Sequence, residues 1–137
     1  MTGVQTCALP IYKILSAPYN GKWSVKQTIG HLAEVDQVNN KRLDEIIAGV
    51  AIMSPAVFEP SNYDPWPVEK VLNYFRTNRT LNIEKYKSLT EEQLLKTSIH
   101  PRLKAAMTPV DLAWFDAEHD DHHLVKINEI IFTLTKN

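Results

Sequence analysis

The chain has 137 residues, a length that predicts one domain with a hydrophobic core of its own. Its 15 Lys and Arg residues nearly balance its 16 Asp and Glu residues, so the basic patch that is typical of nucleic-acid-binding proteins is not expected. Neither a signal peptide of the usual three-part form nor an apolar run near the ~20 residues of a membrane helix is recognisable. We therefore expect a cytoplasmic protein with no nucleic-acid or membrane partner.

The first eleven residues, MTGVQTCALPI, resemble the translation of a common sequencing adapter. Under this interpretation residues 1–11 are an artefact and residues 12–137 form the domain. It also implies that the native protein began further upstream, so that its first segment is missing here. Cys7, the single cysteine, lies in this stretch and cannot form an internal disulfide.

Local signals then predict a first long helix over residues 24–48. Ser24 and Gln27 have the spacing of a capping box, in which each side chain bonds a free backbone amide at the helix start. Apolar residues recur every three or four positions after it, and Gly49 is the expected terminator. The four prolines within residues 53–67 indicate a loop.

Helical spacing of apolar residues predicts a second long helix over 67–88, and Thr90 is the expected cap of a short one over 91–97. Residues 98–107 are expected to form a connection. Thr108 and Pro109 then predict the N-cap and first position of a last helix that runs to about residue 135. We expect no strand, and the fold class is therefore all-α.

The last helix carries two histidines on its apolar face. Its apolar residues leave a gap that steps of three and four would fill at positions 119 and 123, which are His119 and His123. The apolar residues on this face are Leu112, Phe115, Ile127, Ile130 and Leu134. His122 falls ~100° away from His123, towards the edge of the stripe.

Two buried imidazoles one turn apart need polar partners, and two kinds of partner are consistent with the sequence. A divalent metal ion would satisfy both. Hydrogen bonds to carboxylates such as Asp116 or Asp120 would do so as well. His31, on the flank of the first helix's apolar stripe, is the candidate for a third metal ligand.

The stretch GKWSVKQTIGHLAEVDQ, followed about ninety residues later by AEHDDHHLVKI, resembles the DinB-like superfamily. The resemblance covers essentially everything after residue 12. It implies a four-helix bundle, often dimeric, in which three histidines bind one divalent ion of nickel, zinc, manganese or iron. Carried over by position, the metal ligands are His31, His119 and His123.

The resemblance implies two functions. The first is a metal-dependent transferase of the low-molecular-weight thiol type, or a hydrolase, acting on a small thiol or electrophile. The second is a non-enzymatic metal-binding module for stress response or interaction on the same fold. A dinuclear carboxylate site is disfavoured, because the two intermediate helices lack matching carboxylates. Glu34, Asp116 and Asp120 are candidates to orient the imidazoles, although each is also a typical surface residue.

The chain departs from the family in two places. The family's first helix lies before the GKW turn, in a region that is mostly adapter-like here, so we expect that helix to be largely missing or replaced. A short helix within residues 4–16 is the expected substitute. Lys104 stands in a region where relatives often have glycine, so we expect that turn to differ.

Overall fold

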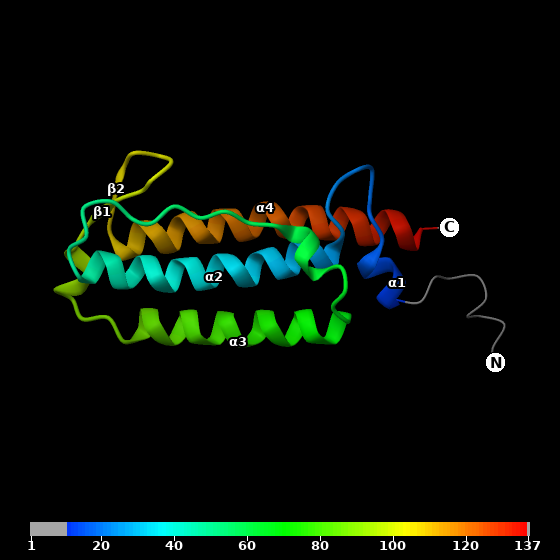
Figure 1. Ribbon diagram of the computed structural model, residues 1–137, viewed down its shortest axis with the longest axis horizontal. Coiled ribbons are helices and arrows are strands. Elements are labelled where there is room, and N and C mark those ends of the chain that lie inside the picture. Colours follow the sequence, from blue (N-terminus) through cyan, green and yellow to red (C-terminus); the bar gives the residue numbers. More distant parts are fainter. Residues whose placement is uncertain (1–10, 137) are drawn as a thin grey trace.

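A computed structural model describes residues 11–136 of the chain. Three long helices lie side by side in it, α2 (Val25–Ile47), α3 (Val68–Lys87) and α4 (Pro109–Thr135), and the short α1 (Ile11–Ser16) packs at one end (Figure 1). The fold is therefore a mostly helical four-helix arrangement with a short first helix. Residues 1–10, which hold most of the adapter-like segment, lie outside the described part.

The connection between α2 and α3 determines the topology. Residues 48–59 run back along the length of the bundle and end in a short 3-10 helix, η2 (Pro60–Tyr63) (Figure 1). As a result α2 and α3 run in the same direction and α4 runs against both (Figure 1). This crossover, residues 48–59, covers one side of the α2–α4 pair.

The predicted N-terminal caps of α2 and α4 are both present. Ser24 accepts from the Gln27 backbone amide at 3.1 Å, and the Gln27 side chain accepts from the Ser24 amide at 2.8 Å. Thr108 forms the equivalent box with Asp111 at the start of α4. Gly49 follows the end of α2 with φ 78°, a conformation that glycine adopts without a Cβ clash. The predicted bounds of the three long helices are confirmed to within about one residue.

Two expectations for the segment between α3 and α4 were wrong. The short helix expected over 91–97 is only a 3-10 turn, η3 (Gln93–Leu95), although the cap at Thr90 forms. Two strands that were not expected, β1 (Ser98–Ile99) and β2 (Ala106–Met107), pair antiparallel. Strands of two residues contain no apolar alternation, so the sequence holds no signal for them.

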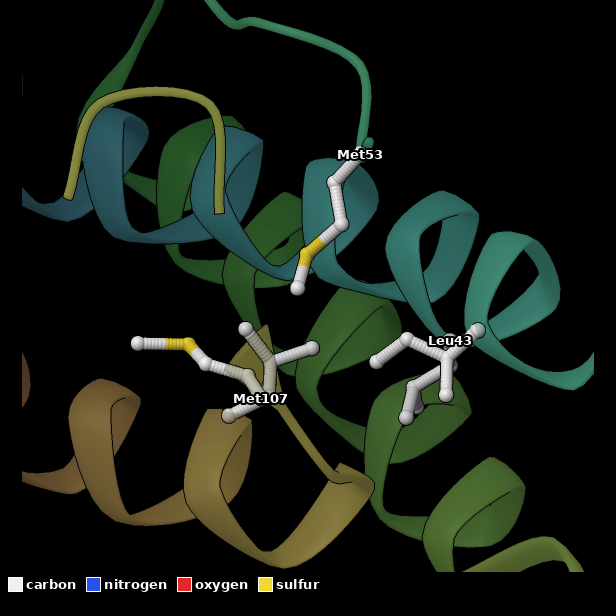
Figure 2. Close-up of a cluster of buried hydrophobic side chains, with 5 residues drawn as sticks. Leu43, Met53 and Met107 are labelled. Atoms are coloured by element: carbon white, nitrogen blue, oxygen red, sulfur yellow. The ribbon is translucent and has the colours of Figure 1, made fainter. Parts of the chain in front are cut away.

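The main core lies at the strand end of the bundle. Met53 from the crossover and Met107 from β2 meet side chains of α2 and α4 there (Figure 2). The cluster comprises Leu43, Ile46, Met53, Met107 and Leu112, all at most 8% exposed. Its position fixes the crossover and the β1–β2 turn against α2 and α4, close to the site described below.

The other end of the bundle is less well covered. The six-residue α1 buries only Ile14, and three large apolar side chains in the C-terminal half of α4 stay exposed: Leu124, Val125 and Phe132. A bundle with a short first helix is expected to expose such surface. Among the described residues, no helix is long and apolar enough to cross a membrane.

A charged network joins the three long helices. Arg79 of α3 contacts Asp36 of α2 at 2.8 Å and Asp120 of α4 at 2.9 Å. The Asp36 side chain is 3% exposed, so Arg79 neutralises a carboxylate that water does not reach. This contact matters for the site because α2 and α4 supply its histidines.

Lys104 adopts φ 59° in the turn between β1 and β2, the left-handed region that favours glycine. Lys104→Gly removes the Cβ clash of that conformation, and we expect it to raise the free energy of unfolding by about 0.5–1 kcal/mol. Urea denaturation measures the change. Arg102→Gly, at an ordinary φ in the same turn, is the control and should lower stability instead. A Lys104→Gly protein less stable than the parent would contradict the explanation.

Candidate metal centre

Three imidazoles meet between α2 and α4. His31 Nε2 lies 3.2 Å from His119 Nε2, and His123 Nε2 lies 3.1 Å from the same atom. One ligand atom from each ring falls within 4.8 Å of those of the others. The structure thus brings together the three histidines that were predicted as metal ligands. His122 is exposed and outside the group, as expected.

Helical geometry accounts for this convergence. His119 and His123 are separated by one turn of α4, so their side chains point in the same direction. Leu112 and Ile130, on the same stripe of α4, are buried, and the two histidines between them are half-buried. His31 is 6% exposed and approaches from α2. The apolar face of α4 therefore presents its histidines to α2, as its spacing predicted.

Two aromatic rings, Trp23 and Phe58, pack against His31 and His123. The Trp23 ring stacks on His123 at 6.0 Å between centroids, with an interplanar angle of 7°. Phe58 packs edge-on against His31 at 4.7 Å. Phe58 was not predicted from the sequence, because the proline-rich crossover has no helical or strand periodicity that would indicate where its side chain points. These rings shield one side of the site from water.

The site holds its imidazoles in the neutral form. Burial lowers the pKa of His31 to about 4, and the nearby His119 and His123 add to the effect. Burial and the same kind of neighbours lower the pKa of His123 to about 4, and burial lowers that of His119. Neutral imidazole is the form that binds metal ions, so metal binding near pH 7 requires no net loss of a proton from these rings.

Hydrogen bonds among the three imidazoles cannot satisfy all of their ring nitrogens. His119 Nε2 faces both other Nε2 atoms, yet a ring nitrogen either donates one hydrogen bond or accepts through one lone pair. Nδ1 of His31 and of His119 is also buried without a hydrogen-bond partner among the described residues. A cation between the three Nε2 lone pairs would satisfy those three nitrogens at once, with the proton of each ring on Nδ1. The donor set fits a divalent metal, and imidazole suits zinc, nickel and iron.

The carboxylates considered as orienting groups have other partners. Glu34 accepts a hydrogen bond from the Tyr63 hydroxyl, and Asp116 accepts one from Asn39 Nδ2. Asp120 pairs with Arg79. Within residues 11–136, none of the three is hydrogen-bonded to an imidazole. Packing against Trp23 and Phe58, rather than these carboxylates, holds His31 and His123 in place.

Asp116 is nevertheless unusual. Burial raises its pKa to about 7, and the charges of Asp36 and Asp120 act in the same direction, while the Asn39 hydrogen bond opposes them. A carboxyl group with this pKa exchanges a proton near neutral pH. It lies one helical turn before His119 and lines a cavity that His119 also lines.

Two cavities flank the histidines. One, of about 250 Å³, lies between α2, the crossover and the N-terminal half of α4, and His119 is in its wall. The other, of about 570 Å³, lies beside His123 and the turn at residues 19–22. Small molecules therefore have room to approach the histidine group from two sides.

Comparisons with known proteins agree with this architecture. A search of curated proteins finds no match. Among solved structures, the chain resembles YfiT from Bacillus subtilis, which is described as a probable metal-dependent hydrolase with an unusual four-helix bundle topology. The TM-score is 0.72 at 19% identity, and the match covers 86% of this chain and 71% of that one. The family model of the DinB superfamily matches residues 13–127. The chain therefore belongs to the DinB superfamily.

Proposed function

We propose that His31, His119 and His123 bind one divalent metal ion and that the protein is a metal-dependent enzyme. The observation that carries the proposal is the convergence of three neutral Nε2 atoms within 4.8 Å, on a face that opens into cavities. A site with three protein ligands leaves coordination positions open, as catalytic sites do and closed structural sites do not. Bound there, the ion would act as a Lewis acid and lower the pKa of a coordinated water or thiol.

Two reactions fit such a site, transfer of a low-molecular-weight thiol to an electrophile and hydrolysis. The relative YfiT, described as a probable metal-dependent hydrolase, supports the second. The residues of this chain contribute in either case. Trp23 and Phe58 exclude water from one side of the imidazoles. Asp116, with its pKa near 7, is placed to accept or return a proton in the cavity beside His119.

The non-enzymatic module stays the alternative. Such a protein needs the same metal site but no room for a substrate, so the two cavities favour the enzyme. We also propose a small-molecule thiol or electrophile as the substrate. The cytoplasmic location, the homodimer and a role in stress response stay predictions.

Metal content by mass spectrometry tests the proposal. We expect about one divalent ion per chain in the parent protein after reconstitution with zinc, nickel or manganese. His31→Ala and His119→Ala should lose it, because each removes one of three ligands. His122→Ala, an exposed histidine on the same helix, is the matched control and should retain it. A parent protein that stays free of metal would overturn the site.

Activity requires a second assay. Metal-loaded protein is mixed with bacillithiol or glutathione and monochlorobimane, and formation of the fluorescent conjugate is followed. We expect a rate that depends on the metal and disappears in His119→Ala. Hydrolysis of 4-nitrophenyl acetate is measured in parallel to separate the two reactions. Metal binding without turnover in either assay would favour the non-enzymatic module.

A further inference from the structure

The cavity beside His119 contains a buried arginine with no acidic partner. Arg42 of α2 is 8% exposed, and no carboxylate lies within 4 Å of its guanidinium in the described part of the chain. Its Nε and Nη2 atoms donate to the backbone carbonyl of Ser54 at 3.3 and 3.2 Å. These bonds anchor the guanidinium to the crossover and leave the N–H groups of Nη1 uncommitted. Asp116 and Glu45 act on this charge only from beyond ion-pair distance. A buried charge without a counter-ion in contact is costly, so a partner is expected.

The neighbour of Nη1 is a second donor rather than an acceptor. His100 Nε2 lies 3.4 Å from Arg42 Nη1. His100 Nδ1 accepts from the backbone amides of Arg102 and Leu103 at 3.2 and 3.1 Å, so it carries no proton. The proton of this imidazole is therefore on Nε2, and Arg42 and His100 present N–H groups side by side. Burial, together with the charges of Arg42 and Arg102, lowers the pKa of His100.

Two adjacent donors without an acceptor between them are suited to an anionic oxygen. Both residues line the 250 Å³ cavity, as do His119 and Asp116. The cavity is lined by two positive side chains, Arg42 and the exposed Arg102, and by the carboxyl group of Asp116. This balance favours a ligand with one negative charge over a ligand with two. Phe58 and Phe115 supply apolar surface between the two ends.

We propose that this cavity binds the carboxylate of a small monoanionic substrate, held by Arg42 Nη1 and His100 Nε2. The remainder of the molecule extends over Phe58 and Phe115 toward the three histidines. The volume is below the ~300–1,000 Å³ of drug-sized sites, so the substrate is small. That the ligand is a substrate rests on the proposed metal-dependent function.

Titration with hexanoate tests the carboxylate site. The probe is added to the full chain stripped of metal by a chelator, and ¹⁵N NMR follows the side chains of Arg42 and His100. Without metal, hexanoate has no ion to coordinate, so the result does not depend on the proposed metal site. We expect saturable shifts of both side chains and binding at least tenfold weaker for 1-hexanol, which has the same tail without the charge.

Two variants locate the binding. Arg42→Gln should weaken hexanoate binding at least tenfold, whereas Arg76→Gln, an exposed arginine on α3, should leave it unchanged. His100→Asn should weaken it several-fold, because an Asn side chain can still accept from the backbone amides of the turn but presents no donor in place of Nε2. If Arg42→Gln does not fold, His100→Asn alone decides.

Three results would overturn the proposal: hexanol binding as tightly as hexanoate, hexanoate binding unchanged in His100→Asn, or hexyl phosphate binding more tightly than hexanoate. Zinc titration of the same proteins separates the two proposals. Zinc binding without hexanoate binding would overturn the carboxylate site and leave the metal site. Hexanoate binding without zinc binding would overturn the proposed function and leave the carboxylate site.

Discussion

Arg79→Met is expected to lower the free energy of unfolding by about 3 kcal/mol, because it leaves the buried Asp36 carboxylate without its cation. Methionine retains much of the side-chain volume, so the loss reports charge rather than packing. Asp120, which also contacts Arg79, loses its partner in the same variant. Denaturation in urea at pH 7.5 measures the change. Arg76→Met, on the exposed face of α3, is the control and should change stability little.

The pH dependence of this variant tests the cause. Burial raises the pKa of Asp36, and the hydrogen bond and charge of Arg79 oppose that rise. Without Arg79 the folded-state pKa rises further, so the folded protein binds a proton more readily than the unfolded chain. The deficit should therefore shrink as the pH falls through the folded pKa. Asp36→Asn combined with Arg79→Met should recover most of the loss at pH 7.5. If Arg79→Met lost as much stability at pH 5 as at pH 7.5, lost packing rather than an unpaired charge would be the cause.

Between pH 7.5 and pH 5, the metal-free parent protein should lose about 2 kcal/mol more stability than His31→Gln, by linkage at 1.36 kcal/mol per pKa unit. His31 has a pKa of about 4 when folded, against 6.5 as a free group. Well above pH 6.5 the His31 imidazole is neutral in both the folded and the unfolded state, so its lowered pKa has no effect on the free energy of unfolding. As the pH falls from 6.5 toward 4, the unfolded chain gains a proton that the folded state does not bind, and stability is lost.

Comparison with the variant is essential here. Burial raises the pKa of Asp116 to about 7, so the folded protein takes up a proton at Asp116 before the unfolded chain does and is stabilised as the pH falls. This effect partly cancels the destabilisation by His31 in the stability curve of the parent protein. Subtracting the His31→Gln curve removes this shared contribution. Chemical denaturation at each pH, with a chelator present, supplies both curves, and His122→Gln serves as a histidine control. Parallel curves for the parent and His31→Gln would contradict a buried, neutral His31.

Local features of the sequence were enough to predict the long helices and the pair of histidines on the apolar face of α4. A capping box, a Thr-Pro helix start and a terminating glycine act within a few residues, so Ser24, Thr108 and Gly49 mark helix ends without tertiary information. The spacing of His119 and His123 within an apolar stripe is likewise a property of one helix. His31 was a candidate from its place on the first helix, and the family resemblance implied it as the third ligand. The structure places it beside the other two.

Tertiary contacts decided the surroundings of that group. The crossover carries Phe58 to His31, and it brings the Ser54 carbonyl to Arg42, although no periodicity in its sequence predicts either contact. Pairing of β1 with β2 buries His100, which the sequence placed in an ordinary connection. Which helices form, and which of their faces carry imidazoles, can be predicted from the sequence because those signals are local. What lies opposite those faces cannot, because contacts between residues as distant as Arg42 and His100 depend on how the chain crosses the bundle.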